Sequence, residues 1–166
     1  MKEAKHANTI SRIEIAAGYC YGECPVSVLV VDSSLNMSYY GGKYSSKKGY
    51  YSGNISMSTW DTLKVQLQQI FYNKLDTVYN NTVDDQSIEI FIDDSTGVKH
   101  IKAQSESLPP KVKTVFYNML SSYKQAKLKP VNNFIRFRTT IQNLPISVKP
   151  KFPPATPRYR KGHPCG

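Results

Sequence analysis

The sequence predicts an α+β fold, a two-layer sandwich in which an antiparallel sheet carries two helices on one face, followed by an extended C-terminal tail. Three observations lead to this fold class. Four segments before residue 56 have strand patterns, two later segments have the apolar spacing of amphipathic helices, and a hairpin pattern lies between the helices. The predicted order is ββββαββα, and placing both helices on one face is the simplest way to cover both amphipathic sets.

The first four predicted strands form a meander. Residues 10–17 alternate apolar and polar side chains, with Ile13 and Ile15 on one side, which is typical of a half-buried strand. Residues 26–31 are an almost continuous run of β-branched side chains, as suits a central strand. Two further strands are predicted on either side of a segment rich in Gly and Lys, around residues 36–40 and 50–55.

The first helix is predicted from apolar residues at three- and four-residue spacing, namely Trp60, Leu63, Leu67, Ile70 and Phe71. A variant capping box begins it at Ser58, with Asp61 in the place of the usual Glu. The capping signal and the apolar period agree on a helix in this part of the chain.

A hairpin and a second helix follow. Residues 88–92 and 98–103 read as its two strands, joined by a turn at residues 94–97. Pro109 and Pro110 suit the first turn of a helix. The apolar face of this helix would consist of Val112, Val115, Phe116, Met119 and Tyr123.

The chain divides into a flexible N-terminus (residues 1–9), the α+β domain (residues 10–128) and a basic, proline-rich tail (residues 129–166). Within the tail, residues 133–141 alternate apolar side chains with arginines and are predicted as an edge strand whose arginines face water. After Leu144, the proline density favours extended polyproline II conformations.

The net charge of +10 is concentrated near the C-terminus. Up to Glu106 there are 10 Lys and Arg against 12 Asp and Glu, whereas the residues from Ser107 onward include 12 Lys and Arg and no acid. A nearly neutral domain therefore has a polycationic end, which favours nucleic acid, anionic lipid headgroups or an acidic protein face as partner.

Length and hydropathy limit the class of protein. A chain of 166 residues with 40% hydrophobic composition is long enough for one core and too short for two comfortable domains. No segment has the apolar length of a signal-peptide core or of a membrane span. The chain as written is therefore expected to be soluble, and either cytoplasmic or exported and processed.

Two cysteines flank a short loop in the sequence Cys20-Tyr21-Gly22-Glu23-Cys24-Pro25. In a three-residue hairpin loop, Cys20 and Cys24 would face each other across two strands within disulfide range, with Gly22 in a left-handed turn position. A structural disulfide or an inert pair of thiols is the favoured interpretation.

Two alternatives for the cysteines remain. One is thiol redox chemistry, against which the spacing counts, because thioredoxin-like sites have two residues between their cysteines rather than three. The other is a zinc site, although its two pairs of ligands would lie far apart in the sequence. That site would consist of Cys20, Cys24, His163 and Cys165.

The same motif, followed by aliphatic residues and then by Tyr39-Tyr40-Gly41, resembles a bacterial family, domain of unknown function 6438. This family is marked by Cys-[Phe/Tyr]-Gly-x-Cys-Pro before a strand. The resemblance extends from about Ile13 to about Lys127 and implies a Gly-rich strand, an amphipathic helix, a hairpin and a closing helix. It implies export or lipid anchoring as common among members but no activity, and the basic tail lies outside the family pattern.

Tyrosines are unusually frequent, with 12 in the chain, and several fall on or near the third and fourth predicted strands: Tyr39, Tyr40, Tyr44, Tyr50 and Tyr51. If one face of the sheet is open, their rings form an aromatic platform for a protein, a peptide or a glycan. Alternatively they fill the core beneath the helices, since strand alternation directs only about half of them outward.

The tail interleaves cations with aromatic residues, and its candidate contacts are Arg136, Arg138, Arg158, Arg160 and Lys161. Such a segment can neutralise phosphates and stack on bases, and it equally suits docking along another protein. A solvated tail without a function is the remaining interpretation.

No residues form a recognisable catalytic pattern, and none of His6, His100 and His163 belongs to a known nucleophile motif. We therefore expect a protein-binding module without a cofactor rather than an enzyme, an accessory or immunity-type subunit of a larger bacterial assembly. Its first predicted contact is the set Tyr39, Tyr40, Tyr44 and Tyr51, with the tail as a second contact. Nucleic-acid binding through the tail and a thiol redox protein that uses Cys20 and Cys24 are the alternatives.

Overall fold

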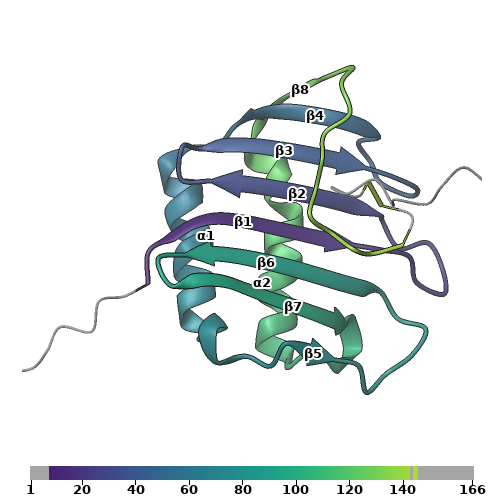
Figure 1. Cartoon of the computed structure of the whole chain (residues 1–166). Helices are drawn as coiled ribbons and strands as arrows, with labels where there is room; N and C mark the ends of the chain where they lie inside the picture. Colours follow the sequence, from purple (N-terminus) through teal and green to yellow (C-terminus); the bar gives the residue numbers. More distant parts are fainter. Residues whose placement is uncertain (1–7, 143, 146–166) are drawn as a thin grey trace, which may run out of the picture.

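The computed structural model of the protein describes residues 8–142 and 144–145. One eight-stranded sheet forms one layer, and two helices cover one of its faces (Figure 1). The spatial order is β5-β7-β6-β1-β2-β3-β4-β8, with β5 and β7 parallel and all other pairs antiparallel. The strands are β1 (Ile10–Ala17), β2 (Ser27–Asp32), β3 (Asn36–Gly41), β4 (Gly49–Asn54), β5 (Val78–Tyr79), β6 (Ser87–Asp94), β7 (Gly97–Gln104) and β8 (Lys127–Pro130).

The helices are α1 (Met57–Gln69) and α2 (Pro110–Ser121), together with the short 3-10 turns η1 (Tyr72–Lys74), η2 (Ser105–Ser107) and η3 (Ser122–Gln125). Helix α1 begins earlier than the predicted capping box, because the Ser56 hydroxyl accepts a hydrogen bond from the Thr59 amide at 3.1 Å. The predicted α+β class, with two helices on one face of an antiparallel sheet, is confirmed.

The main core lies between the sheet and the helices. Strand β1 contributes Ile13 and Ile15, which are almost fully buried, and the centre of α2 contributes Phe116. Ile13 and Ile15 therefore point to the helix side of the sheet, as the alternation in the sequence predicts. It places Glu14 and its neighbours on the other face of the sheet, which we call the open face.

The open face is crossed by residues 131–142, which we call the strap (Figure 1). Starting from β8 at one edge of the sheet, the strap passes over β4, β3 and β2 to β1. Phe137 of the strap is fully buried and packs with Val28 and Val30 of β2 in a second, smaller hydrophobic cluster. Residues far beyond the last helix thus complete the fold.

The predicted edge strand lies elsewhere than expected. Lys127–Pro130 form the edge strand β8 against β4, whereas residues 133–141 have no strand pairing. The alternating apolar residues of that segment make their contacts with side chains of the open face instead of joining the edge of the sheet. Strand β5, only two residues long, was also not predicted.

Candidate protein-binding surface

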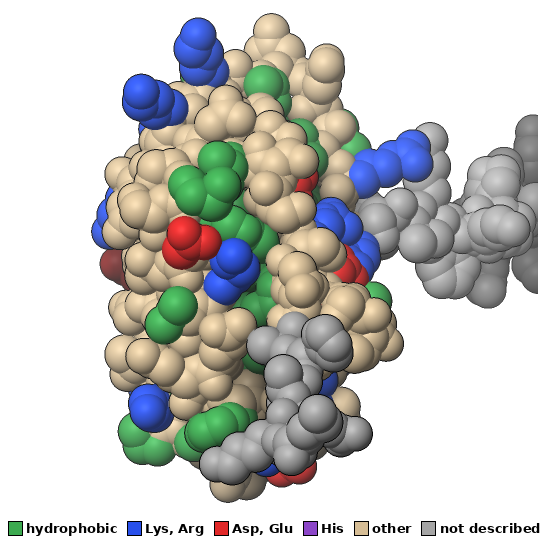
Figure 2. Space-filling view, turned by 90° about the vertical axis from the view of Figure 1, so that its left-hand side faces the viewer, with side chains coloured by type: hydrophobic (Ala, Val, Ile, Leu, Met, Phe, Trp, Pro, Cys, Tyr) green, Lys and Arg blue, Asp and Glu red, His purple; other side chains and the backbone are tan. Residues whose placement is uncertain are grey.

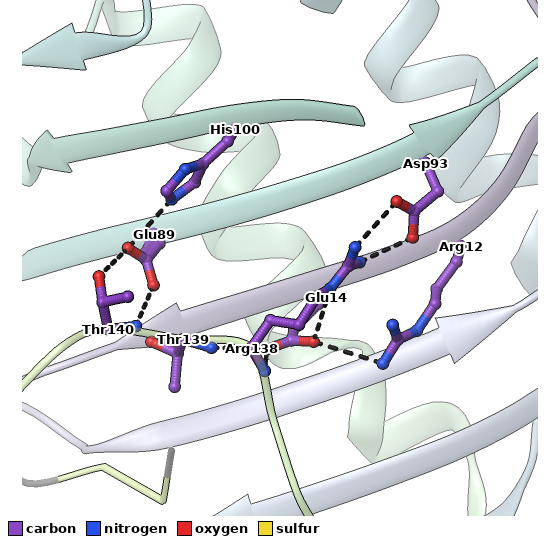
Figure 3. Close-up of polar contacts among 8 residues, drawn as sticks. All are labelled: Arg12, Glu14, Glu89, Asp93, His100, Arg138, Thr139 and Thr140. Atoms are coloured by element: carbon purple, nitrogen blue, oxygen red, sulfur yellow. Dashed lines mark hydrogen bonds and ion pairs between the residues drawn. The ribbon is translucent and has the colours of Figure 1, made fainter. Parts of the chain in front are cut away.

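The centre of the open face contains two buried glutamates that hold the strap (Figure 3). Glu14 on β1 accepts hydrogen bonds through Oε1 from the backbone amides of Arg138, at 2.5 Å, and Thr139, at 3.0 Å. Glu89 on β6 accepts from the backbone amide of Thr140 and, at 2.6 Å, from its hydroxyl. Three consecutive strap amides therefore have carboxylate partners, which satisfies buried charges that would otherwise be costly.

Arg138 is turned inward, contrary to the prediction that the arginines of this segment face water. Its guanidinium binds both carboxylate oxygens of Asp93, at 2.9 and 2.7 Å, and lies 3.5 Å from Glu14. It also lies over the Phe91 ring, 4.9 Å from the centroid. The bidentate contact with Asp93 and the packing on Phe91 hold the guanidinium in one position, so Arg138 helps to attach the strap to the sheet.

The two glutamates differ in their ionisation. Burial raises the pKa of Glu14 above its ordinary value, and the nearby guanidinium groups of Arg12 and Arg138 only partly oppose this. Burial acts in the same direction on Glu89, but hydrogen bonds from Thr140 and from His100 outweigh it and lower the pKa of Glu89. The carboxylate of Glu89 is thus the better stabilised of the two.

A groove of about 530 Å³ lies where the strap ends against β6, β7 and β5. One wall is formed by Thr140 and Gln142 of the strap, and the others by Tyr19, Tyr79, Lys102 and Gln104. The Tyr79 side chain also packs against the main core, so the groove combines chiefly Tyr19 with hydrogen-bonding groups, a mixture common in ligand sites.

The loop between β1 and β2, residues 18–26, stands next to this groove and contains a disulfide between Cys20 and Cys24. Tyr21, between the cysteines, is 92% exposed, and its amide donates to the Asp84 carbonyl at 3.0 Å. Gly22 has a φ of +149°, which a residue with a side chain would adopt only under strain. The loop is longer than the predicted three-residue hairpin, and both cysteines lie within it rather than across two strands.

Gln86 holds the two ends of this loop together. Its side-chain amide donates to the Gly18 carbonyl at 2.9 Å and to the Pro25 carbonyl at 2.8 Å. The Gln86 side-chain oxygen accepts from the Tyr117 hydroxyl at 2.8 Å, so helix α2 supports the loop as well. An exposed ring is therefore presented on a well-supported loop.

Four exposed hydrophobic side chains gather at this end of the sheet: Tyr19, Tyr21, Val78 and Val83. Tyr19 and Val78 line the groove, and Val83 precedes Asp84, which binds the Tyr21 amide. We call these four residues and the groove the loop-end surface. Exposed apolar clusters of this kind commonly mark interaction sites.

Most of the chain, including the disulfide loop, matches one protein family. Residues 11–123 match the sequence model of the family described as Domain of unknown function (DUF6438). The chain belongs to this family. No curated protein and no solved structure matches the chain. The matched residues include the disulfide loop and both buried glutamates, whereas the strap follows the last residue of the DUF6438 match.

The tyrosines predicted as one platform of the DUF6438 domain are divided between the two faces. Tyr39 is buried on the helix side, where it stacks on Tyr123 with ring centroids 4.4 Å apart, and burial raises its pKa to about 12. Tyr51 packs against the same core. Tyr40 pairs with Tyr50 on the open face, with ring centroids 4.8 Å apart, and of these five tyrosines only Tyr44 is exposed.

The remaining predicted site residues are placed as follows. Cys20 and Cys24 are joined to each other, Pro25 offers its carbonyl to Gln86, and Arg136 is exposed on the strap. Five other predicted residues lie outside the described residues: Arg158, Arg160, Lys161, His163 and Cys165. In the part of the chain that the structure describes, no three His, Cys, Asp or Glu side chains are grouped to hold a metal ion. Nor does any helix described there combine the length and apolar composition needed to cross a membrane.

The sequence did not predict that Glu14 and Glu89 bind the strap, or that Tyr21 is part of an exposed surface. A signal for the first was present, because Glu14 and Glu89 each stand between two isoleucines in the centre of a strand. The pattern predicts a polar side chain on the second face, but it does not reveal that a distant segment covers that face.

Proposed function

We propose that this protein is a non-catalytic protein-binding module, an accessory subunit of a larger assembly, and that the loop-end surface is its contact with a protein partner. The observation that carries the proposal is Tyr21, a large aromatic side chain that is 92% exposed on a loop closed by a disulfide. Such a ring can bury a large area in a partner at little cost in conformational entropy, because its backbone is already held.

The charges around the surface favour a protein over a nucleic acid. Two exposed acids, Glu23 in the loop of Tyr21 and Asp84 next to Val83, outnumber Lys102 of the groove and would repel phosphates. Arg138, one of the predicted phosphate contacts, is already paired with Asp93. A thiol redox role has less support, because three residues separate Cys20 from Cys24, where thioredoxin-like sites have two, and both cysteines lie in a loop rather than at a helix N-terminus.

The test is capture of partners from a lysate of the native host by the full-length protein and by the variant Tyr21→Ser. Phe71→Ser is a matched control, because Phe71 is an aromatic residue that is 64% exposed. It directly precedes η1, whose Tyr72 hydroxyl donates to Asp94 next to the β6–β7 turn. That turn lies at the opposite end of the sheet, where hydrophobic side chains form separate groups among polar ones (Figure 2).

We expect the wild type and Phe71→Ser to retain the same protein partner after nuclease treatment. Loss of one aromatic anchor costs about 2 kcal/mol or more, so Tyr21→Ser should weaken binding on the order of 30-fold. Equal capture by Tyr21→Ser, or loss of all protein partners on nuclease treatment, would contradict the proposal.

A further inference from the structure

We infer that the loop-end surface binds a basic, proline-rich segment, and that the protein's own residues 146–166 occupy it when no partner is bound. The inference rests on the proposed function, because it assigns an occupant to the same surface. It follows from the chemistry of the groove, the charges beside it, the sequence of the segment and the point where the segment begins.

The groove has the chemistry that polyproline II segments require. Proline lacks an amide hydrogen, so a proline-rich segment offers its rings to aromatic side chains and its carbonyls to donors. Tyr19 lines the groove, and exposed Tyr21 lies in the same loop. Lys102, Gln104 and Gln142 carry hydrogen-bond donors, of which the Gln104 amide also donates to Ser87 at 3.1 Å. Aromatic-lined grooves with such donors are a recurring mode of proline-rich recognition.

The charges match as well. Glu23 and Asp84 are exposed beside Tyr21 at the outer end of the surface. Residues 146–166 contain no acid and five cations: Lys149, Lys151, Arg158, Arg160 and Lys161. These acids lie at the outer end of the surface, whereas Lys102 lies in the groove. The cations of the segment are therefore expected at the outer end, which favours docking in a defined direction.

The prolines of the segment have the spacing expected of a polyproline II ligand. Pro150 and Pro153 are three residues apart, and so are Pro154 and Pro157. A polyproline II helix has about three residues per turn, so each pair presents both of its rings on one side. Arg158 and Arg160 follow directly and would reach the acids at the outer end of the surface.

The segment also begins at the groove. Thr140, Ile141 and Gln142 of the strap line it, and Leu144 is buried against the open face only two residues later. A segment of about 20 residues that is tethered at its own site has an effective concentration on the order of millimolar. Docking of even a weakly binding segment is therefore favoured within one molecule.

The full-length protein contains a convenient probe for this contact. With Cys20 and Cys24 joined in the disulfide, Cys165 is the remaining cysteine of the sequence and can take a nitroxide spin label without any substitution. In isotope-labelled protein, we expect the label to broaden the amide signals of residues 19–23 and 78–84. Signals at the β6–β7 turn, at the far end of the sheet, should keep their intensity.

Two variants test the chemistry from both sides. The first is the double variant Tyr19→Ser/Tyr21→Ser, and the second is the double variant Arg158→Glu/Arg160→Glu. Each should restore the intensity of the broadened signals, whereas the control Phe71→Ser should leave them broadened. Uniform broadening, or no broadening near residues 19–23, would overturn the inference. Broadening that appears only when spin-labelled and isotope-labelled chains are mixed would also overturn it, because it would show contact between two copies.

The same variants separate this inference from the proposed function. If the label shows no docking but partner capture still depends on Tyr21, the surface binds a partner and the occupancy by residues 146–166 is wrong. If docking is seen and capture does not depend on Tyr21, the assignment of the partner surface fails instead.

Discussion

The two faces of the sheet are covered in different ways. The helix face has one continuous core, formed by regular strands and helices from β1 to α2, with Phe116 of α2 fully buried in it. The open face is half apolar and half charged, and a strap without regular structure covers it through Phe137 and the two buried glutamates. The difference shows that one sheet can combine a permanent core with a cover whose attachment depends on a few specific contacts.

The largest effect is expected on the helix face. Replacement of Phe116 by Ala leaves a cavity beneath α2 that the sheet cannot fill, so the free energy of unfolding should fall by about 3–5 kcal/mol. Urea denaturation followed by circular dichroism measures this loss. Phe134→Ala is the control, because Phe134 is exposed and its replacement should change stability by about 0.5 kcal/mol or less. A loss similar to that of the control would show that this face is not the dominant core.

A smaller effect is expected for the corresponding aromatic residue of the strap. Phe137 is as buried as Phe116, but we expect the strap to detach while the sheet and helices stay folded, because it has no strand pairing with them. The loss for Phe137→Ala is therefore limited to roughly the burial of one phenylalanine, about 1.5–3 kcal/mol. In the absence of denaturant, trypsin should cleave after Arg136 and Arg138 faster in Phe137→Ala than in Phe116→Ala. Equal cleavage of both variants would mean that the strap and the domain unfold together.

The helix face was predictable because its information is local. Apolar residues at a period of two predicted β1, and apolar residues at a period of three to four predicted α2. The predicted cap of α1, Ser58, differs from the observed cap, Ser56, and this changes only the start of the helix. The open face was not predictable, because its cover pairs Glu14 with residues more than 120 positions away. The alternation of residues 133–141 is compatible with an edge strand and with a strap alike. For the same reason, the motif around Cys20 predicted a turn but not the exposed position of Tyr21 next to the groove.

The smallest effects are expected within the charged half of the open face, where Glu14 and Glu89 perform similar tasks in different surroundings. Replacement of either by Gln leaves a strap donor without a good acceptor, which costs about 1–3 kcal/mol. Near neutral pH, Glu89→Gln should cost more than Glu14→Gln, because hydrogen bonds lower the pKa of Glu89, whereas burial raises the pKa of Glu14. Urea denaturation of both variants against the wild type measures the difference.

The pH dependence gives the sharper comparison, since the two glutamates should respond with opposite signs. The raised pKa of Glu14 means that its contribution is fully present below its ordinary pKa and is lost as the pH rises through the raised value. The lowered pKa of Glu89 means that its contribution is present above its ordinary pKa and is lost as the pH falls through the lowered value. Subtracting the unfolding free energy of each Gln variant from that of the wild type across the acidic range should therefore give slopes of opposite sign. Slopes of the same sign would show that the strap holds both carboxylates in one electrostatic environment, and the two attachment points would then have to be treated as a single coupled site.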